Sequence, residues 1–422
     1  MKKNAREEQA HQAIDTKADV LTRETLPTVE PSFRKPGTQN WENLQTNIIT
    51  TGMEEKTVNE NNNKIEQANE TLKNMLLQSL QMQHLVVLAG SGCSYHIGGP
   101  TMNDLWNAIV EDKHKTWAQA VAEKIKYNIT KKNIEAFLSQ VEAAEFLQDA
   151  DINNFLNEAK KIILEKMSSF FQSDQEEKLN SHKTLLHRLS RRRIRDQRLR
   201  VFTTNYDLCF ERAAAKIGCV AIDGFSFMSP RYYAPHYFDY DIIRRSRFSD
   251  DNGNYLEGVF LLYKLHGSVN WEKTDTGVIE KEGPDPQKAC IIYPASGKYQ
   301  QSFNQPFIES ISQYLATIRE PNTCVLVMGF GFNDAHLSEP LLSAVRSNPH
   351  LRLIIVDPNV KEYSDKETNQ HLKTLLELSK NGDDVWFVND KFECFVNRIP
   401  DLKSLTPAER LFKDIKGAMQ QQ

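Results

Sequence analysis

Residues 85–101 read LVVLAGSGCSYHIGGPT, and this stretch decides the fold. It begins with an apolar run, which is typical of a strand buried on both faces, and glycines follow directly. A glycine-rich turn between a strand and a helix can present backbone N–H groups to a phosphate at the positive end of the helix. The stretch therefore predicts an α/β fold whose first turn receives a nucleotide.

The chain after this stretch alternates apolar strands with helices. Strand-like runs are RVFTTNYD, GVFLLYKLHG, ACIIYPAS, TCVLVMGFG, LRLIIVD and DVWFVND, with helical segments between the later ones. This alternation predicts an α/β protein with a doubly wound, mostly parallel, Rossmann-like sheet. The polar motifs GSGCS, TTNYD, KLHGS, GFGFND and VDPN each follow a strand. We therefore expect them to meet in one crevice at the carboxyl ends of the strands.

Composition divides the chain into two regions, the second of which contains an insertion. Residues 1–62 are polar and contain several prolines, which predicts a disordered tail or one that orders against a neighbouring subunit. Residues 63–422 are expected to form one catalytic domain. Within it, residues 107–200 have helical spacing and predict a large helical insertion after the first strand. Thr101 and Asp104 predict a capping box at the start of the helix that leads into this insertion.

Bulk properties exclude several classes of protein. The 422 residues are 40% hydrophobic and 26% charged with a formal net charge of −4, which indicates a soluble globular protein without an overall attraction to nucleic acid or anionic membranes. The six cysteines include no Cys-x-x-Cys pair, which argues against a zinc ribbon and fits a reducing cytoplasm. No apolar stretch approaches the roughly 20 residues that a membrane span needs, and the N-terminus does not look like a signal peptide.

Taken one at a time, the motifs are weak evidence for a nucleotide site. GSGCS lacks the last glycine of the dinucleotide fingerprint, since Tyr95 stands there, so a plain tight turn explains it as well. His266 ends an apolar strand and can accept a proton, although a lone histidine there is more often structural. Asn205 can hold a water or a ribose hydroxyl, while Asp207 taken alone favours capping of the next helix. His336 is expected to pack or to cap a helix, with a ligand role as the less favoured alternative.

Together, GSGCS, GGPT, TTNYD, KLHGSVNW, GFGFNDAHL and VDPN, in this order over roughly residues 84–390, resemble the sirtuin-like superfamily. They are more similar to its bacterial branch of NAD-consuming defence proteins than to the protein deacylases. The resemblance implies that His266 is the catalytic base and that Asn205 and Asp207 lie near the nicotinamide ribose. It also implies a set of residues that hold NAD, the first five of them around the pyrophosphate: Gly90, Ser91, Gly92, Cys93, Ser94, Thr204, Gly329, Phe330 and Asp357.

The resemblance also bears on the reaction. Sirtuin deacylases carry a zinc ribbon built from two Cys-x-x-Cys pairs, and this chain has neither, so no zinc is expected and the acyl-peptide cleft is in doubt. The resemblance thus implies a hydrolase that consumes NAD as its substrate, cleaving the nicotinamide–ribose bond to nicotinamide and ADP-ribose. Two alternatives stay open. One is an NAD-dependent protein deacylase or ADP-ribosyltransferase, and the other is a non-catalytic module that binds NAD or ADP-ribose.

Partners follow from the same resemblance, which implies the effector of a bacterial antiphage system. Because no ATPase motif is visible, we expect the trigger on another polypeptide, with a HerA-type hexameric ATPase as partner of a homo-oligomer of this chain.

The roles of two further segments stay open. RRRIRDQRLR, residues 191–200, is a nucleic-acid patch or, more often, the solvated face of a helix. The aromatic residues 231–248 form a lid, a subunit contact or a packed surface loop.

Overall fold

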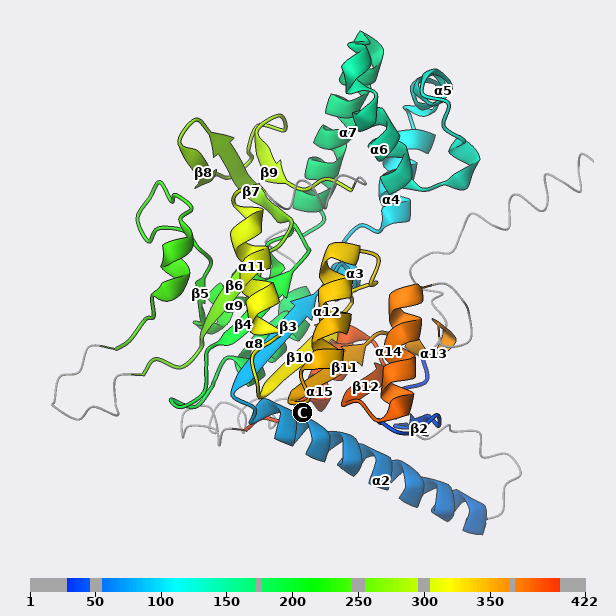
Figure 1. The fold of residues 1–422 in the computed structure, drawn as a ribbon, viewed down its shortest axis with the longest axis vertical. Helices are drawn as coiled ribbons and strands as arrows, with labels where there is room; N and C mark the ends of the chain where they lie inside the picture. Colours follow the sequence, from blue (N-terminus) through cyan, green and yellow to red (C-terminus); the bar gives the residue numbers. More distant parts are fainter. Residues whose placement is uncertain are drawn as a thin grey trace, which may run out of the picture.

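The computed structural model describes residues 29–45, 55–171, 177–244, 255–294, 304–363 and 369–402. These residues form a central nine-stranded sheet (Figure 1). Seven neighbouring strands are parallel, while β1 and β2 add an antiparallel edge, so the predicted mostly parallel α/β sheet is confirmed. In spatial order the strands are β2 (Glu42–Asn43), β1 (Ser32–Arg34), β12 (Val385–Asn389), β11 (Leu351–Val356), β10 (Thr323–Met328), β3 (His84–Ala89), β4 (Leu199–Thr203), β6 (Val259–Lys264) and β5 (Val220–Ile222).

The central strands are apolar throughout because both of their faces are buried. In β3, Leu85 and Val87 pack into the core on one side of the sheet, and Val86 and Leu88 into the core on the other. The first core is completed by α2 (Glu55–Leu80), α3 (Gly92–Tyr95), α8 (Asn180–Leu189), α9 (Cys209–Ile217) and α15 (Phe392–Arg398). The second is completed by α11 (Phe307–Thr317), α12 (Ala335–Ser347) and α14 (Gln370–Asn381).

Strand order places a crevice beside β3. The chain leaves β3 for β4 on one side of it and later returns as β10 on the other side. Crossovers that leave in opposite directions open a crevice at the carboxyl ends of the two strands, and ligands of open α/β sheets bind there. The turns that follow β3 and β10 carry the GSGCS and GFGFND motifs.

A helical lobe stands above this edge of the sheet (Figure 1). It has a core of its own, built from aromatic and aliphatic side chains such as Trp106, Phe137 and Phe155. Its elements are α4 (Met102–Trp106), the π-helix η2 (Asn107–Glu111), α5 (Lys115–Lys124), the 3-10 helices η3 (Ile129–Lys131) and η4 (Glu145–Leu147), α6 (Ile134–Ala143) and α7 (Ala150–Ser169). The capping box is confirmed, because Thr101 Oγ1 accepts the N–H of Asp104 while Asp104 Oδ2 accepts the N–H of Thr101.

The helices of residues 107–200 divide into two groups. Those up to α7 belong to the lobe, whereas α8 contributes Leu185 and Leu186 to the core of the sheet domain. Residues 199 and 200 already lie in β4. The lobe contacts the rest of the molecule through Leu164 and Met167 near the end of α7, which pack with Tyr206.

A second, three-stranded antiparallel sheet lies beside the main one. It consists of β8 (Gly277–Glu280), β7 (Gly267–Thr274) and β9 (Ala289–Ile291). The ACIIYPAS run was expected among the parallel strands, but its strand β9 pairs with β7 in this small sheet. His266 therefore lies in the two-residue link between β6 of the main sheet and β7 of the small one.

The N-terminal region departs from the predicted tail. Residues 1–28 and 46–54 lie outside the described residues, but β1 and β2 form the edge of the main sheet, where β1 pairs with β12. Phe33 of β1 is fully buried, which gives this edge a hydrophobic anchor. The helix α2 begins at residue 55, inside the stretch that was predicted to be a tail. Across the described part of the chain, no helix combines the length and the apolarity that crossing a bilayer requires.

Candidate active site

A cavity of about 580 Å³ lies at the carboxyl ends of β3, β4 and β10, between the sheet and the helical lobe. Most of the residues predicted for NAD binding and catalysis line it, although they come from four separate stretches of the chain. They are Gly90, Ser91, Ser94, Thr204, Asn205, Asp207, His266, Gly329 and Phe330. The structure thus brings these predicted residues together in the crevice beside β3.

Gly92 and Cys93 do not line this cavity, because the turn after β3 packs against the turn after β10. A Cβ atom on Gly92 would lie 2.6 Å from the Cα of Gly329, and one on Gly329 would lie 2.5 Å from the nitrogen of Cys93. Gly329 also has a φ of +58°, which disfavours other residues. These glycines are therefore needed for close backbone contact between two turns. The Cys93 side chain is buried beneath them.

The backbone N–H groups of the first turn are largely used within the protein. Gly90 donates to Met328, Gly92 to Gly329, Cys93 to Gly90 and Ser94 to Ser91. The helix α3 that follows has only four residues. The expectation that this turn offers free N–H groups to a phosphate at a helix terminus is therefore wrong for these four groups.

Ser94 joins the two polar residues of the TTNYD motif. Its Oγ donates to Asp207 Oδ2 at 2.7 Å and accepts from Asn205 Nδ2 at 3.1 Å. Asp207 Oδ1 also accepts the N–H of Cys209 at 3.0 Å, at the start of α9. Asp207 thus holds the start of α9, in line with the capping role predicted for it, and it also orients the Ser94 hydroxyl. The network fixes the Asn205 amide at the cavity wall.

The carboxylate of Asp207 is held in its ionised form. Burial by itself would raise the pKa of Asp207, but the charge of Lys264 and the hydrogen bonds from Cys209 and Ser94 outweigh it and lower that pKa. Lys264 is buried beneath the site, where its Nζ donates to the backbone oxygen of Asp207 and lies 3.2 Å from a carboxylate oxygen of Glu211. Sequence reasoning missed Lys264, although a lysine inside the apolar run VFLLYKL was a signal.

His266 closes one side of the cavity and is only 2% exposed. Its Nε2 lies 3.2 Å from the Nε2 of His336 in the first turn of α12. Sequence reasoning assigned His336 to packing or capping and did not connect it with His266. No pattern within either motif relates the two, because the contact spans 70 residues and depends on the order of the strands.

The helical lobe supplies the opposite wall, with residues that sequence reasoning did not single out. Lys131, Lys132 and Glu135 lie at the junction of η3 and α6 and line the cavity, as do Met167 and Phe170 near the end of α7. Among the lining residues that the structure describes, Lys131 and Lys132 are the only lysine or arginine side chains. Both are exposed. They are the cations of the cavity wall, and Lys132 also pairs with Glu111, whose Oε1 lies 3.6 Å from its Nζ.

Asp357 lies outside the main cavity but in a neighbouring one. That smaller cavity of about 220 Å³ shares Phe330, Gly331 and Asn333 with the main cavity. Burial raises the pKa of Asp357, while its Oδ1 accepts the N–H of Asn359 at 2.7 Å. The predicted contact of Asp357 with an adenosine ribose thus requires a ligand long enough to reach past Phe330.

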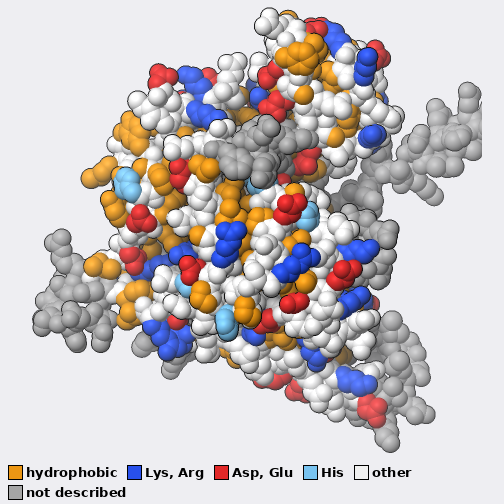
Figure 2. All heavy atoms as spheres, in the orientation of Figure 1, with side chains coloured by type: hydrophobic (Ala, Val, Ile, Leu, Met, Phe, Trp, Pro, Cys, Tyr) orange, Lys and Arg blue, Asp and Glu red, His pale blue; other side chains and the backbone are white. Residues whose placement is uncertain are grey.

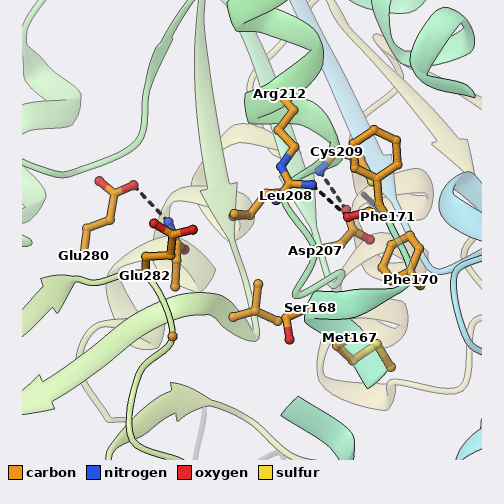
Figure 3. A pocket seen from close by; sticks show the side chains of 13 residues that line it. Met167, Ser168, Phe170, Phe171, Asp207, Leu208, Cys209, Arg212, Glu280 and Glu282 are labelled. Carbon is orange, nitrogen blue, oxygen red and sulfur yellow. Dashed lines mark hydrogen bonds between the residues drawn. The ribbon is translucent and has the colours of Figure 1, made fainter. Parts of the chain in front are cut away.

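A further cavity of about 330 Å³ adjoins the site on the side of the small sheet (Figure 3). It shares Met167, Phe170 and Asp207 with the main cavity, so these residues form a common wall. Glu280 and Glu282 line the far side (Figure 3). Arg212 is held in this cavity by donating to the backbone oxygen of Phe171 at 3.1 Å.

Two arginines of residues 191–200 are turned inward, while Arg195 is exposed. Arg192 is buried and donates to the backbone oxygens of Leu80 and Gln83, while Arg198 is buried and binds Asp241. Because α8 ends before this run, the interpretation as a solvated helix face is wrong for these two arginines. On the face shown in Figure 2, basic side chains are interspersed with acidic ones.

The aromatic residues 231–248 are described as far as residue 244. Tyr233 and Phe238 pack against the core, whereas Tyr232 and Tyr240 are exposed at the surface. No described residue of this segment lines the main cavity. In the described part, the segment is therefore a packed surface loop with exposed aromatic side chains, and the structure gives it no contact with the site.

Comparisons with known proteins bear on this arrangement. Three of the similar solved structures are a Sir2 homologue mutant with 2′-O-acetyl ADP-ribose (13% identity, 79% of this chain and 98% of that chain, TM-score 0.39), a Sir2 homologue–NAD complex (14%, 78% and 91%, 0.39) and a Sir2 homologue mutant with ADP-ribose (14%, 79% and 99%, 0.37). No curated protein matches the sequence. The family model of the SIR2-like domain matches residues 199–387. The segment that carries Asn205, Asp207 and His266 is therefore similar to the SIR2-like domain.

Proposed function

We propose that this protein hydrolyses NAD⁺ at the nicotinamide–ribose bond and releases nicotinamide and ADP-ribose. One observation carries the proposal. A single cavity joins His266, the Asn205–Ser94–Asp207 network and the turns after β3 and β10. Its volume of about 580 Å³ is in the usual range for small-molecule sites. The match to the SIR2-like domain, which includes Asn205, Asp207, His266 and the turn after β10, supports the same conclusion.

Each part of the site has a role in the proposed reaction. The C–N bond breaks with its electron pair passing to the nicotinamide nitrogen, which leaves an oxocarbenium-like ribose. The ionised Asp207 stabilises this positive charge, since a fixed carboxylate acts strongly in a site shielded from water. Asn205 orients a water that attacks the sugar carbon, and His266 accepts the proton which that water loses. No hydride moves, and no resident cofactor takes part.

The substrate spans the neighbouring cavities in this proposal. Lys131 and Lys132 of the lobe face the pyrophosphate, because the N–H groups of the glycine turn are largely occupied. The adenosine half extends past Phe330 to Asp357. Thus the sheet supplies the groups for bond cleavage and the lobe supplies the positive charge.

The decisive test is release of nicotinamide from NAD⁺ by the purified chain. His266→Ala and Asn205→Ala are each expected to lower kcat, and loss of the base is expected to cost about 10²- to 10⁴-fold. The matched control is His350→Ala, because His350 is an exposed histidine distant in sequence from all four parts of the site. Wild-type rates in His266→Ala would contradict the proposal, as would calorimetric binding of NAD⁺ by the wild type with no product formed.

A second candidate activity is ADP-ribosyl transfer, and the cavity of Figure 3 favours it. An acceptor held there would approach the site past Asp207, and the carboxylate of Glu282 suits a cationic acceptor group, whereas Glu280 already pairs with Arg231. Label from NAD⁺ carrying a radioactive adenylate would then remain on protein after denaturation. Recovery of all label as free ADP-ribose would leave hydrolysis as the activity. Protein deacylation has weaker support, since the Cys-x-x-Cys pairs are missing from the sequence.

The cellular context is part of the proposal and rests on the resemblance of the motifs. The protein acts as a cytoplasmic effector of a bacterial antiphage system, as a homo-oligomer paired with a HerA-type ATPase. Light scattering of the purified chain, alone and mixed with that ATPase, tests this part. Monomers in both samples would contradict it without touching the proposed chemistry.

A further inference from the structure

His336 touches the proposed base from a different part of the sheet. Its Nε2 lies 3.2 Å from the Nε2 of His266, with ring centroids 5.4 Å apart and an interplanar angle of 34°. Both rings are buried, at 9% and 2% exposure. His266 follows β6, whereas His336 enters from α12 after β10. The contact therefore joins the strand ends on either side of β3.

Two imidazole nitrogens at this distance share one hydrogen, because a stable contact needs one N–H and one lone pair. We propose that His336 is a positioning residue that accepts the Nε2–H of His266 and so leaves the lone pair of His266 on Nδ1. This inference rests on the proposed function, since it names the nitrogen that takes the proton. His336 itself touches neither water nor substrate in this scheme.

The tautomer decides whether His266 can work as a base. If His336 donated instead, the Nε2 lone pair of His266 would be occupied and Nδ1 would carry the hydrogen. With His266 as donor, the attacking water forms its bond to the sugar carbon and gives its proton to Nδ1. The Nε2–H···Nε2 contact then becomes charge-assisted and stronger. His336 thus plays the part that an orienting carboxylate plays in hydrolase triads.

Asp334 adds a third potential ligand beside the pair. The ligand atoms of His266, Asp334 and His336 lie within 4.8 Å of one another. An ion bound between the two Nε2 atoms would occupy the lone pairs of both and displace the hydrogen between them. The metal content of the purified chain therefore distinguishes a shared ion from a hydrogen-bonded pair.

Two substitutions of His336 separate positioning from packing. His336→Gln keeps an acceptor near the position of Nε2, whereas His336→Leu fills similar space without one. We expect His336→Leu to lower kcat on the order of 10- to 100-fold, which is less than loss of the base itself. KM and the calorimetric affinity for ADP-ribose are expected to stay within about 2-fold, because His336 does not touch substrate. His336→Gln is expected to recover most of the loss in kcat.

A direct readout does not depend on turnover. ¹⁵N-histidine NMR of the full chain, assigned with His266→Asn, is expected to show His266 protonated at Nε2 and unprotonated at Nδ1. If the wild type shows this tautomer but releases no nicotinamide, the proposed function fails and the pairing stands. If nicotinamide is released while His266 carries its hydrogen on Nδ1, the pairing fails and the proposed function stands. Two further results would overturn the pairing. One is an unchanged kcat in His336→Leu. The other is a metal analysis that finds one ion per chain in the wild type and none in His336→Leu.

Discussion

At the scale of single residues, the site depends on buried polar groups whose partners lie far away in sequence. Ser94 bridges Asn205 and Asp207, and His266 meets His336. The TTNYD and KLHGS motifs identify Asn205, Asp207 and His266 because each follows an apolar strand. They do not identify the partners, since a serine in a glycine turn and a histidine in a helix look ordinary when they are read alone.

His182 is a buried titratable side chain near the site, and its pKa can be tested. It is fully buried between Phe210 and Phe392, with both ring centroids 5.1 Å away, and neither ring nitrogen has a hydrogen-bond partner among the described residues. Burial lowers the pKa of His182 to about 4. The charge of Asp207 opposes this shift, and His96 adds a smaller lowering effect. The ring is thus neutral in the folded protein at pH 7.

This lowered pKa predicts a dependence of stability on pH. Between pH 6.5 and about 4 the unfolded chain binds a proton that folded His182 does not, so stability falls as pH falls through this window, by about 3 kcal/mol. Urea unfolding at pH 7 and pH 4.5 is expected to show a smaller loss for His182→Phe than for the wild type. The exposed His350→Gln is expected to behave as the wild type. Equal losses in all three proteins would contradict the assignment.

At the scale of elements, two glycine turns are packed against each other. Because a Cβ on Gly92 would collide with the backbone of Gly329, neither turn can move aside without disturbing β3 or β10. Gly331 in the second turn differs, since a Cβ there would meet nothing closer than the Asn333 side chain at 3.4 Å. The two positions make a matched pair for mutation.

Gly92→Ala is therefore expected to destabilise the protein by about 1–3 kcal/mol or more, as overpacking against backbone does. Gly331→Ala is expected to stay within about 0.5 kcal/mol of the wild type. Urea unfolding at pH 7 measures both differences. If the two variants were equally stable, the close packing of these turns would not be the reason for the glycine at position 92.

Individual strands were predictable from the sequence to different degrees. The runs HLVVLAG, TCVLVMGFG and LRLIIVD are apolar without alternation, which correctly predicted parallel strands buried on both faces. ACIIYPAS has the same composition, yet it forms β9 of the small antiparallel sheet, because composition alone does not determine which partner a strand finds. Residues 32–34 were missed, since so short a strand at a sheet edge leaves almost no periodic signal.

At the scale of the whole molecule, the site lies between a sheet that was predictable and a lobe whose role was not. The helical insertion was recognised from its spacing, and its position after the first strand was known. That it would stand above the carboxyl edge of the sheet and line the cavity could not be read from the sequence. This placement depends on contacts such as those of Leu164 and Met167 with Tyr206.

The lobe's contribution can be tested through its two lysines. Lys131→Ala combined with Lys132→Ala is expected to raise KM for NAD⁺ about 10-fold or more with little change in kcat, because the charges meet the pyrophosphate and not the bond that breaks. The effect is expected to weaken at high salt, since exposed charges are screened. Lys113→Ala with Lys161→Ala, at exposed positions of the same lobe but outside the cavity lining, is the matched control.

The lobe has a hydrophobic core of its own and contacts the rest of the molecule through Leu164 and Met167 near the end of α7. Selection can therefore alter its cavity-facing surface without disturbing the strands that hold His266 and Asn205. Related proteins can in this way acquire new substrate preferences by exchanging one module while they keep the same bond-breaking machinery. A graft of a foreign lobe between residues 101 and 171 is thus a practical route to an enzyme of altered nucleotide preference.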